Sequence, residues 1–362
     1  MSRREYDESD VRIRPNKRGS RPRTKDRPAH SDAVPARVTG VDRGRYATVV
    51  DEGGAAEREV PAMRARELRR QAIVPGDVVD LVGDTTGAEG SLARIVRIQE
   101  RSTLLRRSAD DTDPIERAVV ANADQVVIVV AAADPEPRPG FIDRALVAAH
   151  DADITPVLVI TKADLREPED LLSTYKPLGI EVIVSRAGTG TAPEGGSLPV
   201  DAEALEALHE QLDGHLSALL GHSGVGKSTL VNALTGSARA TGGVNAVTGR
   251  GRHTSSSAIA LRPQDCAPGT WIIDTPGVRS FGLAHVDPQG VLDAFEDLVS
   301  ATADCPRGCT HAEGAPGCAL DAWVAEGRAG EHGAERLASL RRLLASRSDP
   351  DTDAKELGDT GA

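Results

Sequence analysis

The sequence predicts a doubly wound α/β domain, with a small all-β barrel before it and a helical region with clustered cysteines after it. Three observations predict this arrangement. Short β-like runs fill residues 33–100, apolar strands alternate with helical segments and a glycine-rich loop over 118–285, and three of the four cysteines lie within 305–318. Alternating strands and helices are typical of a parallel sheet that is covered on both faces.

Length and composition set the first limits. The chain has 362 residues, which is room for two or three domains. Its longest apolar run, Val126 to Ala133, is far shorter than the roughly 20 residues of a membrane-spanning helix. The N-terminus is rich in arginine and lacks the apolar stretch of a secretory signal. We therefore expect a cytoplasmic protein with no membrane partner, and we expect it to be a monomer.

Charge is distributed unevenly along the chain. The formal net charge is −12, which argues against a protein that binds nucleic acid over its whole surface. Residues 1–30, however, hold ten Lys and Arg against five Asp and Glu, and residues 31–110 hold thirteen of each. Any contact with RNA should therefore come from the first third of the chain. The two ends, 1–32 and 349–362, have the polar composition of disordered tails, basic at the first and acidic at the second.

Residues 33–100 are predicted to form a small closed barrel. About five β-like runs, such as Tyr46 to Val50, are separated by Gly and Asp turns, which suits an OB-fold. OB-folds often stack nucleic-acid bases on aromatic side chains, but Tyr46 is the one aromatic residue in 31–110. We therefore expect contact with folded RNA through phosphates and shape, with an ordinary solvated arginine face as the alternative. The arginines concerned are Arg64, Arg66, Arg69, Arg70, Arg101, Arg106 and Arg107.

After a polar connector over 101–117, the pattern becomes that of a parallel α/β sheet. Residues 125–131 form a continuous apolar run, which is typical of a strand buried on both faces. The remaining predicted elements are strands at 156–160, 182–184 and 216–220, and helices at 141–150, 169–178 and 202–212. The C-terminal region, 286–348, is predicted to be helical, with one helix over 336–345.

A phosphate loop follows the strand that ends at Leu220. Residues 221–229 match the pattern GxxxxGK[ST] in full and lead into an apolar helical segment. In such a loop the backbone N–H groups surround the phosphates, the lysine contacts the β- and γ-phosphates, and the first hydroxyl ligates Mg²⁺. The chain is therefore predicted to bind a nucleotide, with Lys227 also active in catalysis and Ser228 a magnesium ligand. The binding residues are Gly221, His222, Ser223, Gly224, Val225, Gly226, Lys227, Ser228 and Thr229.

A second motif selects the base. Thr161-Lys162-Ala163-Asp164 follows a predicted strand and matches the [NT]KxD box. A carboxylate accepts hydrogen bonds from the N1–H and the exocyclic amine of guanine, whereas adenine has no N1–H and leaves the acid poorly paired, at a cost of about 1–3 kcal/mol. Lys162 is expected to pack over the base, and the loop that begins at Ser185 resembles one whose backbone N–H meets the guanine carbonyl. The predicted nucleotide is therefore GTP.

Two later segments are predicted to bind Mg²⁺ and the γ-phosphate. Thr254, in a glycine-rich segment, is the expected magnesium ligand and γ-phosphate sensor, with Ser255 as the alternative. A predicted strand ends in Asp274-Thr275-Pro276-Gly277. Asp274 would hold Mg²⁺, and the N–H of Gly277 would contact the γ-phosphate.

The motifs occur in a rotated order: guanine box, then phosphate loop, then magnesium segments. In Ras-like GTPases the guanine box comes last, but such domains tolerate permutation because the sites still coincide in space. With the barrel before it and the cysteines after it, the chain resembles the ribosome small-subunit-dependent GTPase A family of circularly permuted GTPases. The resemblance covers about residues 35–345. It implies a GTPase that assists late maturation of the small ribosomal subunit, with the subunit and its rRNA as partners, and leaves on hydrolysis.

The glutamine that usually orients the water attacking GTP is missing from its expected place in the sequence. Ras-like enzymes orient this water with a Gln just after the DxxG box, and residues 278–280 contain none. Members of the resembling family likewise carry an apolar residue there, and His253 is the matching candidate for positioning the water. The alternative is a loop histidine without a chemical role. We expect intrinsic turnover as slow as about 10⁻⁴ per second, stimulated by the small subunit.

Cys305, Cys309, His311 and Cys318 form the last motif. Three Cys and one His, closely spaced in a loop-rich segment, are typical of a tetrahedral structural Zn²⁺ site. The resembling family has the same arrangement, with gaps that differ here by about one residue. A disulfide is the alternative, which a reducing compartment disfavours.

Three other functions compete with this interpretation. Another P-loop enzyme, an ATPase or a nucleotide-dependent kinase, is disfavoured by Asp164, and its test is a comparison of GTP with ATP affinity. A nucleotide-switched RNA-binding scaffold with little catalysis fits the missing Gln, and turnover with subunits present tests it. A large-subunit assembly GTPase shares the permuted order, but the barrel and the cysteine cluster count against it.

Overall fold

The computed structural model describes residues 30–68, 71–108, 116–188, 200–236, 258–275, 286, 288–330 and 332–348. Almost all of the predicted N-terminal tail, 1–32, and all of the predicted C-terminal tail, 349–362, lie outside these residues. No helix within the described ranges is long and apolar enough to cross a membrane.

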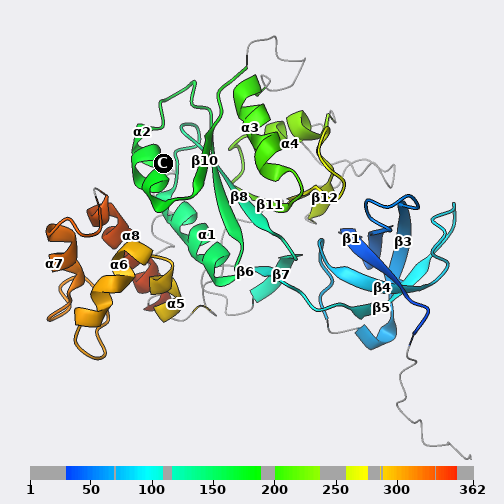
Figure 1. Ribbon diagram of the computed structural model, residues 1–362, viewed down its shortest axis with the longest axis horizontal. Helices are drawn as coiled ribbons and strands as arrows, with labels where there is room; N and C mark the ends of the chain where they lie inside the picture. The colour runs from blue at the N-terminus through cyan, green and yellow to red at the C-terminus, as the bar shows by residue number, and fades with distance from the viewer. Residues whose placement is uncertain are drawn as a thin grey trace, which may run out of the picture. The chain divides into compact units, whose positions relative to one another are not determined.

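Five strands close into the N-terminal barrel (Figure 1). They are β1 (Val34–Asp42), β2 (Arg45–Val50), β3 (Arg58–Arg64), β4 (Val78–Gly83) and β5 (Ala93–Ile98). Neighbours pair in the order β1, β2, β3, β5, β4, and β4 pairs again with β1, so that the sheet closes on itself. The pairing of β3 with β5 is parallel and the others are antiparallel. This topology confirms the predicted OB-like barrel.

Alternating burial explains why these short segments become strands. In β3, Val60 and Ala62 are fully buried whereas Pro61 and Met63 are exposed, which is the period of two expected for one face on a core. Leu81 and Ile95 fill the same core from β4 and β5. A short 3-10 turn, η2 (Arg66–Leu68), adds Leu68 to it.

A buried carboxylate just before β4, that of Asp77, stabilises the barrel through an ion pair and a backbone hydrogen bond. Asp77 is fully buried and accepts hydrogen bonds from the Nε and Nη2 atoms of Arg101, at 2.7 and 2.9 Å, and from the N–H of Val74 at 2.8 Å. Arg101 also donates to the carbonyl oxygen of Ala72 at 2.7 Å. The guanidinium that was expected to face RNA is therefore committed to neutralising Asp77.

The segment 101–117, predicted as a connector, contains regular structure instead. A two-stranded antiparallel hairpin is formed by β6 (Leu104–Ser108) and β7 (Glu116–Ala121). Its charged residues conceal the pattern in the sequence, but Leu105 and Val120 are buried and belong to the apolar cluster of the α/β domain. The hairpin is held by this packing rather than by a strong local strand pattern.

The α/β domain contains six strands of an eleven-stranded sheet whose other five strands form the barrel. Its strands are β8 (Gln125–Ala131), β9 (Thr155–Thr161), β10 (Glu181–Val184), β11 (Leu216–Leu220), β12 (Ile259–Leu261) and β13 (Trp271–Asp274). They pair in the order β10, β9, β8, β11, β13, β12, with β12 antiparallel and the rest parallel. Every residue of β8 and β11 is buried, as predicted for strands covered on both faces. At its edge β12 also pairs with β1 of the barrel, through Ile259 and Gly40.

Helices cover both faces of this sheet (Figure 1). One apolar cluster includes side chains of α1 (Pro139–Asp151) and α2 (Glu169–Tyr175), and another includes those of α3 (Ala202–Leu212) and α4 (Lys227–Thr235). A 3-10 turn, η3 (Lys176–Leu178), extends α2. The helix α3 begins where it was predicted, because the carboxylate of Asp201 caps it by accepting from the N–H of Ala204 at 3.0 Å. The doubly wound arrangement is therefore confirmed.

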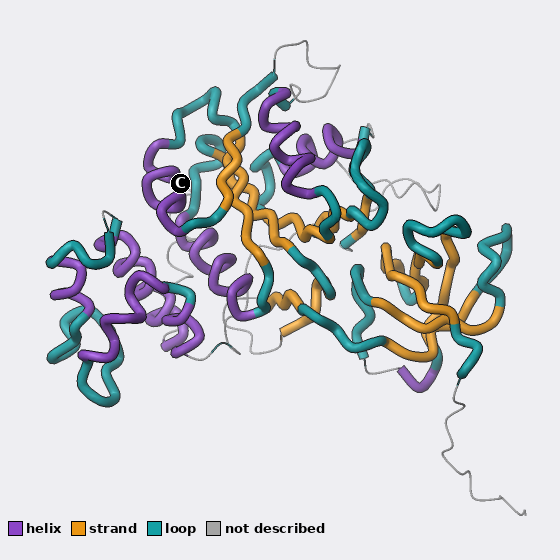
Figure 2. The backbone as a smooth tube through the Cα atoms, in the orientation of Figure 1, coloured by secondary structure: helices purple, strands orange, loops and turns teal. Residues whose placement is uncertain are grey.

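The C-terminal region consists of helices and loops (Figure 2). Its elements are α5 (Pro288–Asp293), α6 (Glu296–Val299), η4 (Ser300–Asp304), α7 (Leu320–Ala325) and α8 (Gly333–Ser348), which contains the predicted helix 336–345. A polar link joins α8 to the α/β domain: Arg342 donates to the buried carboxylate of Asp143 at 3.1 Å, and the hydroxyl of Tyr175 donates to the same carboxylate at 2.9 Å.

Replacing Arg101 with Ala should lower the free energy of unfolding by about 3–5 kcal/mol, because the carboxylate of Asp77 would remain buried without its cation. Urea denaturation of the full chain measures this change. Arg66→Ala is the control, since Arg66 is exposed and such surface substitutions change stability by no more than about 0.5 kcal/mol. Equal stability of Arg101→Ala and the wild type would contradict the role given to this ion pair.

Candidate nucleotide-binding site

The phosphate loop connects β11 to α4. Gly221 follows the last residue of β11, and Gly226 caps the N-terminus of α4. A Cβ atom on Gly221 would lie 2.5 Å from the carbonyl oxygen of Val129, and Gly226 has a φ of 91°, in the left-handed region. Only glycine fits both positions without strain. The tight turn places the N-terminal N–H groups of α4 beside the loop, which is the arrangement that binds phosphate.

Lys227 and Asp274 face each other across this loop. The ammonium of Lys227 donates to the carbonyl oxygen of Gly221 at 3.2 Å and lies 4.0 Å from Oδ1 of Asp274. Burial lowers the pKa of Lys227, and the carboxylate of Asp274 partly opposes this. Oδ1 of Asp274 is buried and accepts no hydrogen bond from the described residues. A buried carboxylate oxygen in that state suits an oxygen-seeking cation such as Mg²⁺.

The hydroxyl of Thr161 ties the guanine box to the phosphate loop. Thr161 is the last residue of β9 and is buried. Its Oγ1 donates to the carbonyl oxygen of Val225 in the phosphate loop at 2.6 Å and lies 3.2 Å from the carbonyl oxygen of Val130 in β8. One side chain therefore joins two motifs that are 64 residues apart in the chain.

The other end of the guanine box contacts the loop after β10. Oδ1 of Asp164 accepts a hydrogen bond from the N–H of Ala187 at 2.9 Å, and the N–H of Ala163 donates to the carbonyl oxygen of Ser185 at 3.1 Å. Asp164 is exposed, and no other hydrogen bond to its carboxylate is formed by the described residues. The structure thus brings Asp164 and Ser185 to the same edge of the sheet.

Sequence reasoning missed a third segment of this site, the loop after β8. The ammonium of Lys162 donates to the carbonyl oxygen of Asp134. Arg166 donates from Nε to the carbonyl oxygen of Ala132 at 2.9 Å and from Nη2 to the carboxylate of Glu136 at 2.7 Å. An Asp-Pro pair directly after an apolar strand was the available signal, because ligands bind at the carboxyl ends of such strands.

Several predicted residues lie outside the described part of the chain. They are His253, Thr254 with its alternative Ser255, and Gly277. The remaining nucleotide residues lie at the carboxyl ends of β9, β10, β11 and β13. Among them, His222 contacts α1, since its ring lies 4.4 Å from that of Phe141.

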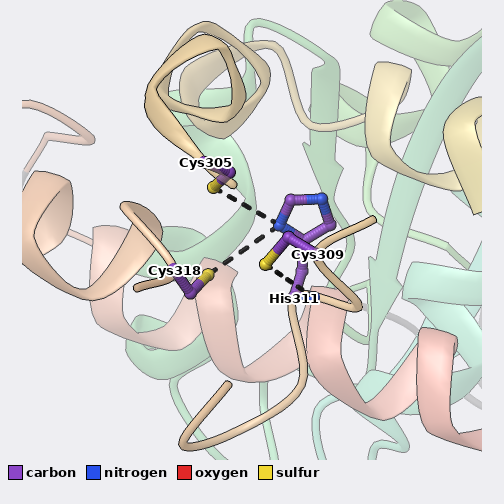
Figure 3. A group of neighbouring side chains, drawn as sticks. All are labelled: Cys305, Cys309, His311 and Cys318. Carbon is purple, nitrogen blue, oxygen red and sulfur yellow. Dashed lines mark hydrogen bonds between the residues drawn. The ribbon is translucent and has the colours of Figure 1, made fainter. Parts of the chain in front are cut away.

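Cys305, Cys309, His311 and Cys318 converge in the C-terminal region (Figure 3). Their ligand atoms all lie within 4.8 Å of one another. Nδ1 of His311 is 3.7 Å from the sulfur of Cys305 and 3.8 Å from that of Cys318. Sulfur and nitrogen ligands at ordinary zinc distances and tetrahedral angles lie about 3.6 Å apart. The donor set and its spacing therefore fit one zinc ion.

Backbone N–H groups donate to two of the cluster's sulfur atoms, which favours thiolate at those two positions. The N–H of Ala319 donates to the sulfur of Cys305 at 3.2 Å, and the N–H of His311 donates to that of Cys309 at 3.4 Å. Burial and the neighbouring thiols raise the pKa of Cys318, and burial lowers the pKa of His311. A bound dication would offset the first effect and would use the neutral imidazole that the second provides. All four cysteines are free thiols.

Residues 98–284 match the sequence profile of the RsgA GTPase family. A protein of Pseudomonas aeruginosa (strain LESB58) named "Small ribosomal subunit biogenesis GTPase RsgA" is 37% identical over 290 residues, which are 78% of this chain and 77% of that protein. The chain belongs to the RsgA GTPase family. RsgA GTPases are GTP hydrolases, and membership implies GTP and Mg²⁺ at the site described above.

Other relatives agree with this assignment. A protein of the same name from Ectopseudomonas mendocina (strain ymp) is 36% identical over 288 residues, 77% of this chain and 76% of that protein. The crystal structure of YjeQ from Thermotoga maritima matches with a TM-score of 0.58 at 26% identity, covering 87% of this chain and 99% of that one. The structure of YloQ, described as a circularly permuted GTPase, matches with a TM-score of 0.60 at 21% identity over 88% and 97%, a likeness of fold. Both solved structures thus agree with the fold described above.

Replacing Thr161 with Val should weaken GTP binding about tenfold, because the volume is kept while the buried carbonyl oxygen of Val225 loses its donor and the phosphate loop loses its tether. Equilibrium binding of a fluorescent GTP analogue measures this affinity. Thr161→Ser keeps a hydroxyl and should bind within about twofold of the wild type. If Thr161→Val bound the analogue as tightly as Thr161→Ser, the tether would have no part in holding the site.

Proposed function

We propose that this GTPase binds the small ribosomal subunit, assists its late maturation, and leaves when GTP is hydrolysed to GDP and phosphate. The observation that carries the proposal is the junction of guanine box and phosphate loop through Thr161, in a chain that matches relatives named for small-subunit biogenesis over most of their length. A subunit partner also places its work in the cytoplasm, and one copy of the chain contains every motif that the reaction needs.

Guanine is selected at the end of β9. The exposed carboxylate oxygen of Asp164 accepts from N1–H and the exocyclic amine, while its other oxygen is held by the N–H of Ala187. Lys162 packs over the base from its contact with the loop after β8, and the loop that begins at Ser185 supplies a backbone N–H to the guanine carbonyl. An adenine ring would leave the carboxylate poorly paired, which disfavours an ATPase.

The phosphates are bound at the other end of the site. The N–H groups of residues 221–229 surround the β-phosphate, and Lys227 contacts the β- and γ-phosphates. Ser228, Thr254 and Asp274 would hold Mg²⁺. The positive charge of the ion would stabilise the negative charge that develops on the phosphate oxygens during hydrolysis. The N–H of Gly277 contacts the γ-phosphate. Oδ1 of Asp274 accepts no hydrogen bond from the described residues, which supports its role as a magnesium ligand.

His253 positions the attacking water. This chain lacks the Gln that follows the DxxG box in Ras-like enzymes, and an imidazole nitrogen is able to accept a proton from water while holding it in line with the γ-phosphate. Turnover is then slow without the subunit, which stimulates hydrolysis when it binds. This accounts for a GTPase whose turnover is low until it binds the small subunit.

The barrel supplies the contact with rRNA. Of the arginines singled out from the sequence, Arg64, Arg66 and Arg106 are exposed on the barrel or the following hairpin, and Arg107 is half-buried. Arg69 and Arg70 lie outside the described residues, and Arg101 is withdrawn from the set because it neutralises Asp77. Exposed guanidiniums without aromatic neighbours suit phosphates of folded RNA.

One Zn²⁺ ion stabilises the C-terminal region. Cys305, Cys309, His311 and Cys318 supply four ligands, so no position is left for substrate and the role is structural. Arg341 donates to the carbonyl oxygen of His311 at 3.1 Å and so connects the cluster to α8.

GTP turnover by the wild-type protein should rise by at least tenfold when purified small subunits are added, because a partner that stabilises the transition state can accelerate such hydrolysis by up to about 10⁵-fold. The assay compares small subunits, large subunits and neither, each with GTP and with ATP. Large subunits should have no effect, and ATP should not be hydrolysed. Equal GTP turnover in all three conditions would refute the proposed partner.

His253→Ala should lose at least tenfold of the subunit-stimulated turnover while binding GTP as tightly as the wild type, because the base is recognised elsewhere. Single-turnover hydrolysis at saturating subunits and nucleotide binding are measured on the same preparation. Full stimulated turnover in this variant would remove the histidine from the mechanism.

Cys309→Ser should lower the zinc content from about one ion per chain towards zero and destabilise the C-terminal region, because hydroxyl oxygen is a poor ligand for Zn²⁺. Elemental analysis and thermal unfolding measure the two effects. Cys266→Ser is the matched control, since Cys266 lies outside the cluster and should leave the zinc content unchanged. Zinc-free wild-type protein of unaltered thermal stability would contradict the structural role.

A further inference from the structure

The loop between β2 and β3 of the barrel, residues 51–57, is attached to two strands of the α/β domain. The indole Nε1 of Trp271 donates to the carboxylate of Glu52, whose other oxygen accepts from Nε of Arg37 at 2.7 Å. Arg262 forms an ion pair with Glu57 at 2.7 Å. The Cζ atom of Arg262 also lies 4.5 Å from the centre of the Trp271 ring, a cation–π contact that joins the two attachments.

These contacts sit at one end of the strands that lead to the hydrolysis site. Trp271 is the first residue of β13, and Asp274 is the last. Arg262 follows the last residue of β12, while Ile259 at the start of β12 pairs with Asp274 and with Gly40 of the barrel. The segment that holds His253 and Thr254 ends just before β12. The barrel therefore touches β12 at both of its ends.

The attachment is partly buried and its geometry is constrained. The side chains of Arg37 and Glu52 are 22% and 19% exposed, which weakens solvent screening relative to a surface pair. Glu57 is oriented by a hydrogen bond from the N–H of Gly53 at 2.6 Å, and the hydrogen bond from Arg262 lowers the pKa of its carboxyl. Trp271 and Val49 of β2 are buried members of one apolar cluster. A buried indole N–H needs an acceptor, and here the barrel provides it.

We propose that Glu52 and Glu57 are positioning residues for the stimulated reaction: through Trp271 and Arg262 they transmit the placement of the RNA-bound barrel to β13 and Asp274. The inference rests on the proposed function, since it assumes that the small subunit stimulates hydrolysis. Extended strand rises about 3.3 Å per residue, so Trp271 lies about 10 Å from Asp274 along a single stiff element. A displacement of about 1 Å at a reacting group changes rates by up to about 100-fold, so a small shift of this strand suffices.

The test uses Glu52→Gln and Trp271→Phe in the full-length protein. The first keeps the size of the side chain but offers one acceptor to two donors, and the second removes the indole donor. Each should lower the maximal subunit-stimulated kcat about tenfold. Turnover without subunits, the KM for GTP and the subunit concentration that gives half-maximal stimulation should each stay within about twofold. A loss of folding would move all of these together, and thermal unfolding on the same samples would reveal it.

Charge exchange at the second attachment provides a rescue. Glu57→Arg and Arg262→Glu alone each place like charges together and should lower the stimulated kcat, whereas the two together restore an opposite pair and should recover most of it. A double variant as impaired as the worse single one would overturn the role of this pair.

Asn122→Gly is the matched control for the loss of a contact between the barrel and the α/β domain that does not involve β12 or β13. Nδ2 of Asn122 donates to the carbonyl oxygen of Gly76 in the barrel at 3.0 Å, but neither β12 nor β13 takes part, and glycine accepts the positive φ of this position. Stimulation should be unchanged. An equal loss in Asn122→Gly, or full stimulation in both Glu52→Gln and Trp271→Phe, would overturn the inference. Absence of stimulation in the wild type would instead refute the proposed function.

Discussion

The parallel pairing of β9, β8 and β11, with the hydroxyl of Thr161 across their ends, is the constraint on which the site depends. Thr161 donates to a carbonyl oxygen of the phosphate loop and reaches one of the central strand, and both bonds are buried. Losing this buried hydrogen bond would leave a carbonyl oxygen of the phosphate loop without its donor, so the hydroxyl holds the base end and the phosphate end of the site together. Selectivity for guanine and contact with the phosphates then become properties of one rigid edge.

Circular permutation leaves this edge intact because sheet geometry depends on pairing and not on chain order. The strand before the guanine box precedes the strand before the phosphate loop in the sequence, yet they flank the same central strand, β8. The permutation does change what lies at the two sides of the domain. The barrel precedes the α/β domain in the chain, and the cysteine-bearing region follows β13. The magnesium end of the site, at the end of β13, is therefore followed in sequence by the cysteine-bearing region. It is connected to the barrel by the pairing of β12 with β1.

Local motifs could be predicted from the sequence, whereas contacts between distant segments could not. The phosphate loop, the guanine box and the four zinc-type ligands are each defined within fewer than fifteen residues, and the barrel and doubly wound sheet follow from periodicity. The bond from Lys162 to Asp134 spans 28 residues and that from Trp271 to Glu52 spans 219. The Asp-Pro pair at 134–135 indicates a loop at the end of a strand but not its partner, and no pattern in the sequence indicates the pairing of Trp271 with Glu52. In the sequence Arg101 could not be distinguished from the exposed arginines, because its partner Asp77 becomes buried only in the folded structure. The hairpin β6–β7 was missed because charged residues obscured two buried apolar positions.

A crystal structure with a non-hydrolysable GTP analogue tests the central claim most directly. The account predicts one nucleotide along the edge formed by β9, β8 and β11, with the carboxylate of Asp164 on the N1–H and amine of guanine and the ammonium of Lys227 on the phosphates. Guanine and phosphates held in separate pockets, or a base bound away from Asp164, would contradict it.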